Sequence, residues 1–255
     1  MHLVDLRSPQ IGALSRDVPF VFPIAALEQH GPHLPLFTDS LLCAEVTRRA
    51  AESLGDRLLF APLLWLGNSH HHMDFPGTLS AAPRVYLDLL ASLIDDAVHH
   101  GFRRIVLFNG HGGNTVPGSQ AVFEARQRYR ERRDLLLLSA TYWMLGAEPW
   151  KEALPAGQQF LQRRMGHACE WETSMILRIA PRLVGEFQRL EPVLFGEAFE
   201  SADRAWVTQD RSTPGYIGDP RHATAEKGEA LLRSFARSAV AFLDRVAAWD
   251  GSTWA

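Results

Sequence analysis

The segment EQHGPHLPLFTD at residues 28–39 gathers acidic and imidazole side chains at a spacing that suits a metal site. Glu28 and His30 are two apart, so in an extended chain they point to the same side. Asp39 lies at a predicted helix start and is close enough in sequence to fold back onto them. Each residue alone also suits a simpler role: a solvated glutamate, a loop histidine or a helix-capping aspartate. Together they predict a site for zinc, manganese or iron.

The second segment, NGHGGN at residues 109–114, surrounds His111 with three glycines. Glycines at a strand-to-helix turn let the backbone pass very close to another group. That group could be a phosphate held by backbone N–H groups at a helix start, but the spacing fits neither the Walker pattern nor the dinucleotide fingerprint. A metal-bound His111 explains the histidine as well as the glycines.

The third segment, GHACEWETS at residues 166–174, contains His167 and Glu172. On one helix, residues five apart point roughly 140° away from each other. Both reach one site only if His167 lies on the approach loop and the helix begins near Glu170. Glu172 is then a metal ligand and His167 an acid/base group; the alternative is a helix-start glutamate and a core histidine. Cys169 lacks the base that a nucleophilic cysteine needs.

A run of three histidines, residues 70–72, precedes the loop FPGT at residues 75–78. Three consecutive side chains converge on one ion less freely than spaced ones, so we do not expect the triplet to bind metal directly. We expect the loop to form the rim of a pocket. His72, Gly77 and Thr78 are therefore candidate substrate-binding residues.

The elements that must position these residues alternate along the chain. Apolar runs at 18–26, 58–66, 104–109 and 135–140 predict strands, and periodic segments at 38–54, 83–101, 116–132, from about 170 and at 224–249 predict helices. Residues 187–221 lack clear periodicity and are expected to be loops. Strands separated by helices indicate one α/β domain spanning 1–255, an αβα sandwich with a mostly parallel sheet. Ligands of such sheets bind beyond the carboxyl ends of the strands, where the first two segments lie.

The composition excludes several other classes of protein. The chain has 255 residues, 46% of them hydrophobic, and a net charge of −3, so no basic field attracts nucleic acid. Two cysteines are too few for a disulfide framework. No apolar run reaches the roughly 20 residues of a membrane span, and the first residues lack a signal-peptide core. We expect a soluble, cytoplasmic protein without nucleic-acid or membrane partners.

The strings EQHGPHLPLFTD, FPGTLS, NGHGGN and HACEWETS, with the later GYIGDP and ATAEKGE, resemble signature segments of the creatininase (creatinine amidohydrolase) family. The resemblance covers the chain from about residue 18 to 245. It implies an α/β fold, a centre of two divalent metal ions, a small-molecule amide substrate and a ring-like homo-oligomer such as a hexamer. The NGHGGN form places the chain nearer the deformylase and mycofactocin-peptidase branch than the true creatininases.

The resemblance also implies roles for individual residues. It makes Glu28, Asp39 and His111 the ligands of one metal ion. His30 and Asp39 would bind the second, with Asp39 bridging the two. His167 matches the residue that family members use for proton transfer.

One departure from the family concerns the second metal ion. True creatininases carry tyrosine and then a metal-binding glutamate where this chain has Gly112 and Gly113. The resemblance leaves Glu172 as the replacement, with Glu170 as the alternative and as a candidate substrate contact. Gly112 becomes a further substrate-binding candidate. Trp143 matches a tryptophan that lines the creatinine pocket.

The predicted function is hydrolysis of a C–N amide bond, in a cyclic or linear amide or a formamide, by water activated between two metal ions. Zinc is the first choice of metal, with manganese and iron as alternatives. His167 would protonate the departing nitrogen. The missing tyrosine–glutamate pair argues against creatinine as the substrate. Alternatives are a peptidase acting on a short peptide terminus, a creatinine amidohydrolase proper, and a catalytically idle α/β protein with one structural metal.

Overall fold

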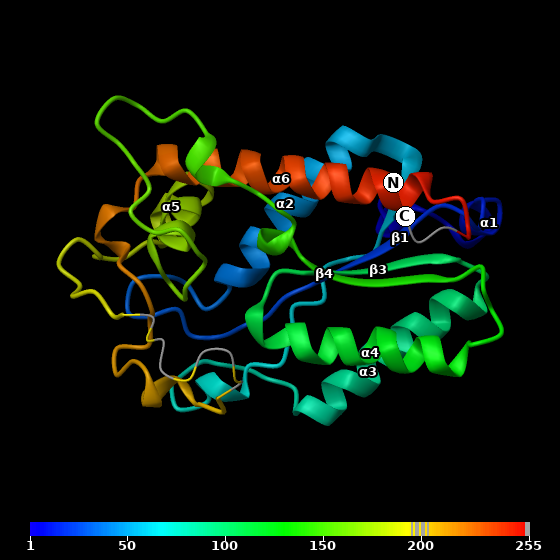
Figure 1. Ribbon diagram of the computed structural model, residues 1–255, viewed down its shortest axis with the longest axis horizontal. Helices are drawn as coiled ribbons and strands as arrows, with labels where there is room; N and C mark the ends of the chain where they lie inside the picture. Colours follow the sequence, from blue (N-terminus) through cyan, green and yellow to red (C-terminus); the bar gives the residue numbers. More distant parts are fainter. Residues whose placement is uncertain (195, 197–198, 200–201, 203, 253–255) are drawn as a thin grey trace.

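Four strands, all parallel, form the central sheet of the molecule (Figure 1). The computed structural model describes residues 1–194, 196, 199, 202 and 204–252. The strands are β1 (Phe20–Ile24), β2 (Leu59–Phe60), β3 (Arg104–Asn109) and β4 (Leu136–Thr141), in the order β2-β1-β3-β4. Each neighbouring pair runs parallel. The predicted α/β fold with a mostly parallel sheet is confirmed.

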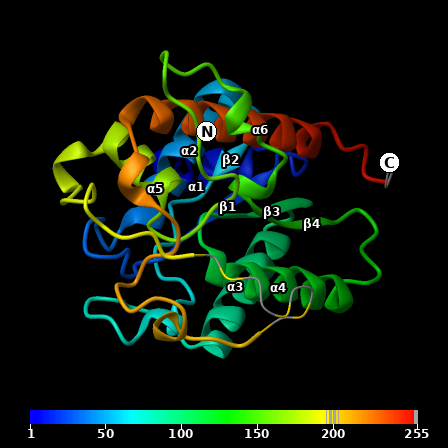
Figure 2. The same cartoon turned by 60° about the vertical axis from the view of Figure 1, so that its left-hand side comes forward.

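Helices cover both faces of this sheet. The helices of the described residues are α1 (Ser8–Gly12), α2 (Thr38–Leu54), α3 (Pro83–His99), α4 (Thr115–Arg128), α5 (Glu170–Ile179) and α6 (Ala225–Ala248). Helices α2 and α6 lie along one face, and α3 and α4 lie along the other (Figures 1 and 2). No helix in the described part of the chain is long and apolar enough to cross a membrane.

Alternate side chains of each central strand pack into separate cores. Val21 of β1 and Val106 of β3 belong to the core that includes α2, α5 and α6. Phe22 and Leu107, each one residue further along, belong to the core that includes α3 and α4. Successive strand residues point to opposite faces, and both faces are covered, so β1 and the interior of β3 are apolar on both faces.

The second predicted strand is shorter than its apolar run. The sequence predicts extended chain in the sheet over 58–66, but β2 contains only Leu59 and Phe60. The hydrogen-bond register to β1 shifts by one residue after Ala61: the Ala61 N–H donates to the Val21 oxygen, but the next donor is Leu64, which reaches the Pro23 oxygen. The chain nevertheless stays beside β1, because Leu64 forms an isolated parallel bridge to Ile24. Within 187–221, the elements found among the described residues are short 3-10 turns and single bridges.

Candidate active site

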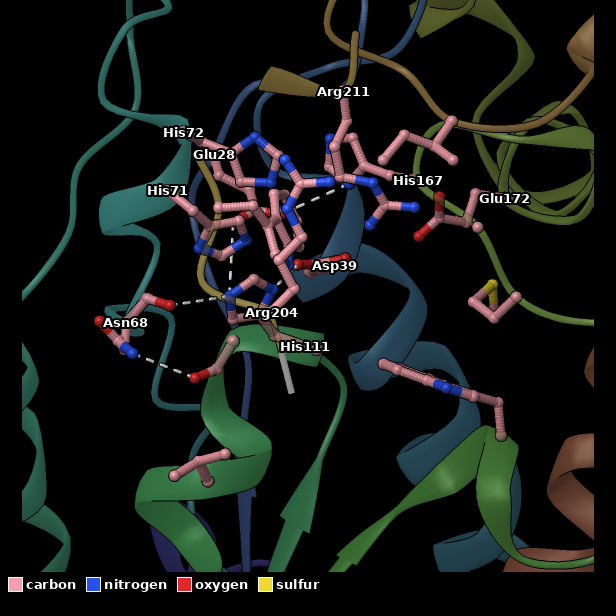
Figure 3. Close-up of a pocket in the computed structure, with 18 of the residues that line it drawn as sticks. Glu28, Asp39, Asn68, His71, His72, His111, His167, Glu172, Arg204 and Arg211 are labelled. Carbon is pink, nitrogen blue, oxygen red and sulfur yellow. Dashed lines mark hydrogen bonds and ion pairs between the residues drawn. The ribbon is translucent and has the colours of Figure 1, made fainter. Parts of the chain in front are cut away.

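Four segments that follow strands or begin helices meet beyond the carboxyl-terminal ends of the strands. Ile24 pairs with Asn109 across the sheet, so β1 and β3 end at the same level. The chain after β1 carries Glu28 and His30, and the turn after β3 carries His111. The first turns of α2 and α5 supply Asp39 and Glu172. Figure 3 shows the labelled side chains converging on a shared space.

His30 is oriented by the main chain of Glu28. Its Nδ1 lies 3.1 Å from the main-chain oxygen of Glu28, and because a carbonyl can only accept, Nδ1 carries the hydrogen. The lone pair is therefore on Nε2, which lies 3.2 Å from Asp39 Oδ1 and 3.8 Å from Glu172 Oε1. A histidine whose other nitrogen donates to a carbonyl is the usual arrangement of a metal ligand.

His111 lies between two of the carboxylates. Its Nδ1 is 2.7 Å from Asp39 Oδ2, and its Nε2 is 3.4 Å from Glu28 Oε2. The Nε2 atom donates to the main-chain oxygen of Asn68 at 3.1 Å, which leaves the lone pair on Nδ1. The Asn109 side chain accepts from the His111 N–H at 3.0 Å and donates to its carbonyl oxygen at 2.7 Å. These bonds fix the glycine-rich turn.

Several of these buried atoms have no hydrogen-bond partner despite their close packing. They are Glu28 Oε2, His30 Nε2, Asp39 Oδ2 and Glu172 Oε2. Buried polar atoms are normally hydrogen-bonded, whereas lone pairs that face one another suit a shared cation. Two sets of possible ligand atoms, from Glu28–His30–Asp39 and from His30–His167–Glu172, each lie within 4.8 Å of one another. The residues present fit divalent metal ions.

The carboxylates strongly affect the two ligand-like histidines. Burial disfavours a charged His111, but Glu28 and Asp39 outweigh it and raise the pKa to about 9. Burial is likewise outweighed at His30, where Asp39 and Glu172 raise the pKa well above its ordinary value. A metal ion that takes the place of these protons must release them.

Gln29 holds two further histidines in place. Its main-chain oxygen accepts from His167 Nε2 at 2.8 Å. Its side-chain amide donates to the Gly215 oxygen at 2.8 Å and to His72 Nδ1 at 2.7 Å. Its Oε1 accepts from the Gly31 N–H at 2.9 Å, which fixes the orientation of the amide. His167 therefore carries its hydrogen on Nε2 and a lone pair on Nδ1.

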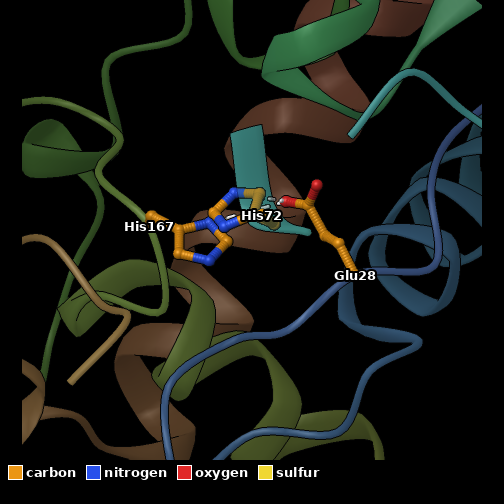
Figure 4. Close-up of side chains that lie close together, drawn as sticks. All are labelled: Glu28, His72 and His167. Atoms are coloured by element: carbon orange, nitrogen blue, oxygen red, sulfur yellow. Dashed lines mark ion pairs between the residues drawn. The ribbon is translucent and has the colours of Figure 1, made fainter. Parts of the chain in front are cut away.

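That lone pair of His167 faces the pocket. Nδ1 lies 3.6 Å from Glu28 Oε1, and His72 Nε2 lies 3.3 Å from the same oxygen (Figure 4). Burial and the nearby His30 and His72 hold the pKa of His167 well below its ordinary value. Neutral His167 therefore presents a proton acceptor to the pocket.

The histidine triplet is closer to the site than the sequence indicated. His70–His72 form a short 3-10 turn, and both His71 and His72 line the pocket. Ligand-type atoms of Glu28, His71 and His111 lie within 4.8 Å of one another, as do those of Glu28, His72 and His167. The tight turn brings two consecutive rings to one wall, which the geometry of an extended chain does not predict.

The pocket above this cluster has a volume of about 720 Å³. His72, Gly112 and Trp143, all predicted substrate contacts, line it. Residues that the sequence did not single out also line it, on the segments 165–166, 204–206 and 211–217: Met165, Gly166, Arg204, Ala205, Trp206, Arg211 and Ile217. Those segments lack periodicity, so only the structure could place them.

Three other predicted substrate residues do not line this pocket. The Thr78 hydroxyl accepts a hydrogen bond from the Gln29 N–H at 3.1 Å and so helps to hold the segment that carries the site residues. Gly77 packs against Leu36. Glu170 faces away from the pocket and accepts from Lys227 Nζ at 2.6 Å. The acidic side chain of α5 that lines the pocket is Glu172.

The two glycines after His111 differ in the space around them. A Cβ atom at Gly113 would overlap the main-chain oxygen of Asn68 and the ring of His111, whereas Gly112 has open space. A glutamate at position 113 has no room in this turn.

Known proteins are similar to this chain over most of its length. A family profile described as creatinine amidohydrolase (Creatininase) matches residues 4–243. The "Mycofactocin precursor peptide peptidase" of Mycolicibacterium smegmatis is 34% identical over 243 residues, covering 91% of this chain and 86% of that protein. The "Creatinine amidohydrolase" of Pseudomonas putida is 31% identical over 228 residues, covering 85% of each.

Solved creatininases have the same fold. A mutant creatininase complexed with creatine matches with a TM-score of 0.80 and 27% identity, over 96% of this chain and 98% of that one. A zinc–zinc form and a manganese form match with TM-scores of 0.78 and 0.77, each at 28% identity over 96% of this chain and 97% of theirs. The chain, a hydrolase by this relationship, belongs to the creatininase (creatinine amidohydrolase) family.

Proposed function

We propose that this protein is a metal-dependent hydrolase that cleaves a C–N amide bond of a small molecule, with two divalent ions and an activated water. The bond lies in a cyclic or linear amide or in a formamide. The observation that carries the proposal is the convergence of unpaired lone pairs from Glu28, His30, Asp39 and Glu172 beside a neutral His167. Zinc is the first choice of metal, and manganese or iron suits the same ligands.

The ligands divide into two overlapping sets. Glu28, Asp39 and His111 would hold one ion, and His30, Asp39 and Glu172 would hold the other. Asp39 suits the bridging place because its two oxygens lie toward His30 and His111 respectively. Ions held there would supply Lewis acidity, which polarises an amide carbonyl and activates water.

The proton is moved by His167. Its Nδ1 accepts a proton from the attacking water as the water oxygen bonds to the carbonyl carbon. The same atom gives that proton to the amide nitrogen as the C–N bond breaks, because an amine leaves poorly as an anion. The hydrogen bond from Nε2 to the Gln29 oxygen keeps the required tautomer in place.

A peptide terminus is the second candidate substrate. The identity of 34% to a mycofactocin precursor peptide peptidase favours it, and a cavity of about 720 Å³ admits a short peptide. Creatinine is disfavoured by the glycines at positions 112 and 113. The proposal includes a cytoplasmic homo-oligomer, for example a hexamer, which light scattering of the purified protein would test.

The first test is metal content per chain, measured by elemental analysis of gently purified protein. We expect about two ions in the wild type and about one in Glu172→Gln, because that variant loses a carboxylate of the second set. Glu170→Gln is the matched control and should keep both ions. If no stoichiometric transition metal binds after zinc, manganese and iron are supplied, the proposal is wrong.

The second test is turnover of small amides, formamides and short peptides by the metal-loaded protein. His111→Ala should abolish metal-dependent hydrolysis. An idle protein with one structural metal would lose stability on chelation, yet it would hydrolyse none of these compounds.

A further inference from the structure

Two arginines line the same pocket as the metal-ligand candidates (Figure 3). Arg204 and Arg211 both line the pocket, and Figure 3 shows their side chains reaching toward the imidazoles and carboxylates. The guanidinium of Arg211 lies over the ring of Trp206, with its carbon 4.8 Å from the ring centre. Stacking of this kind holds the guanidinium plane in a fixed orientation.

The charges that line the pocket favour an anion once metal is bound. The acidic side chains among the described lining residues are Glu28, Asp39 and Glu172, and all three are metal-ligand candidates. The two divalent ions of the proposed function would carry four positive charges, which exceed the three negative charges of these side chains. A pocket of one sign of charge with low-dielectric walls concentrates ligands of the opposite sign.

The remaining walls are suited to an apolar group. Trp143, Met165 and Ile217 line the same cavity. A ligand that suits this lining therefore combines an amide, an apolar body and an anionic group. Guanidinium groups bind carboxylates through two parallel hydrogen bonds.

We propose that Arg204 and Arg211 bind a carboxylate of the substrate, so that the protein acts on amides of amino acids whose α-carboxylate is free. N-acyl amino acids and the C-terminal residues of short peptides both belong to this class. The inference rests on the proposed function, because it names the substrate class of the same site. It assigns to the arginines a specificity role rather than a part in bond cleavage.

The test compares two probes that differ in the carboxylate alone. N-acetyl-L-phenylalanine and N-acetyl-L-phenylalaninol share the amide and the ring, and calorimetry measures their binding to the zinc-loaded protein. The acid should bind at least about tenfold more tightly than the alcohol, since hydrogen bonds to charged groups contribute about 1.5–3 kcal/mol. In Arg204→Gln and Arg211→Gln this preference should fall below about threefold.

Arg163→Gln is the matched control. Arg163 also lies over a tryptophan, with its guanidinium carbon 5.8 Å from the Trp150 ring centre, but it lines a different cavity. This variant should retain the preference for the acid. Because both pocket arginines are exposed, their substitution is compatible with folding, which circular dichroism and zinc content would verify.

Three results would overturn the inference. They are equal or undetectable binding of the two probes, a preference that survives both arginine substitutions because the metal ions bind the carboxylate, and tighter binding of inorganic phosphate than of the acid. Turnover of the same compounds separates this inference from the proposed function. Arginine-dependent binding without hydrolysis would contradict the hydrolase alone, whereas hydrolysis without a preference for the acid would contradict the carboxylate site alone.

Discussion

Gln29 uses its main-chain oxygen and both atoms of its side-chain amide to hold other groups. The amide reaches His72, Gly31 and Gly215, and the main-chain oxygen holds His167. Partners of this kind typically change activity or metal affinity by 10- to 100-fold when removed.

We therefore expect Gln29→Met to lower kcat by roughly 10- to 100-fold with two ions still bound. Methionine keeps the length of the side chain but neither orients His72 nor satisfies Gly215. Steady-state kinetics combined with elemental analysis would measure this. Gln188→Met, at an exposed position, is the control. An unchanged kcat in Gln29→Met would show that the amide merely fills space.

The glycines at positions 112 and 113 should respond differently to the same change. Gly113→Ala should lower the free energy of unfolding by about 1–3 kcal/mol, the usual effect of overpacking, because the new methyl group overlaps Asn68 and His111. Gly112→Ala, with open space around it, should stay within about 0.5 kcal/mol of the wild type. Denaturant unfolding would measure both. Equal effects would show that the turn adapts easily.

At the scale of elements, the first turn of α5 directs two acids to different places. Glu170 binds Lys227 of α6, whose side chain is buried, and Glu172 faces the pocket. Glu170→Gln should lower the free energy of unfolding by about 3 kcal/mol, because it leaves a buried ammonium without its counter-charge. Metal content should not change. Loss of an ion without loss of stability would instead make Glu170 the ligand.

Glu229 of α6 joins three helices. It binds Arg49 of α2 at 2.9 and 3.0 Å and Arg178 of α5 at 2.8 Å. Hydrogen bonds from Arg49, opposed by partial burial, lower the pKa of Glu229 from 4.5 to about 2. A lowered pKa means that the stabilisation is complete above pH 4.5 and is lost as the pH falls through about 2.

Glu229→Gln should accordingly reduce the free energy of unfolding at pH 7 by up to about 1 kcal/mol, the upper end for exposed pairs. The difference from the wild type should shrink between pH 4.5 and 2. Denaturant unfolding at several pH values would measure it. Glu124→Gln on α4 should have little effect at any pH. A difference that grows toward acid would mean that folding raises the pKa of Glu229 instead of lowering it.

The strands and helices that carry the site could be predicted because their apolar periods are regular. The strand at 104–109 was predicted with its observed limits. The limits of the second strand could not be predicted, because an apolar run does not show where the hydrogen-bond register to β1 shifts by one residue. The directions of the Glu170 and Glu172 side chains depend on the residue at which α5 begins. If the helix began one residue earlier or later, each side chain would point about 100° away from its present direction.

The site was predictable where motifs follow strands or stand at helix starts, and not in segments that carry no motif. The structure brings Glu28, His30 and His111 together because the ends of parallel strands fix their place. Arg204 and Arg211 lie in a segment without periodicity, so nothing in the sequence relates them to the pocket. His71 and His72 form one wall of the pocket because residues 70–72 adopt a 3-10 turn. A run of three histidines does not predict that turn.

At the scale of the whole molecule, bound metal should stabilise the fold. Ligand candidates come from the chain after β1, from α2, from the turn after β3 and from α5. An ion that binds the folded state alone, at 100 times its Kd, adds about 2.7 kcal/mol. For a chain of this size that corresponds to a Tm shift of about 5–10 °C.

Chelation should therefore lower Tm by about 5–10 °C, and zinc should restore it. Differential scanning calorimetry would measure both steps. His111→Ala should show a smaller dependence of Tm on zinc. A Tm unaffected by chelation would mean that the ions do not connect these elements.

The wide spacing of the ligands along the chain has a consequence for biosynthesis. Glu28, His30 and Asp39 leave the ribosome early and close together, whereas Glu172 follows only after the strands of the sheet have emerged. A nascent chain thus carries Glu28, His30 and Asp39 while the third carboxylate, Glu172, is still unmade. If the proposed second ion is held by Glu172, we expect it to bind only after α5 has been synthesised, late in the maturation of this protein.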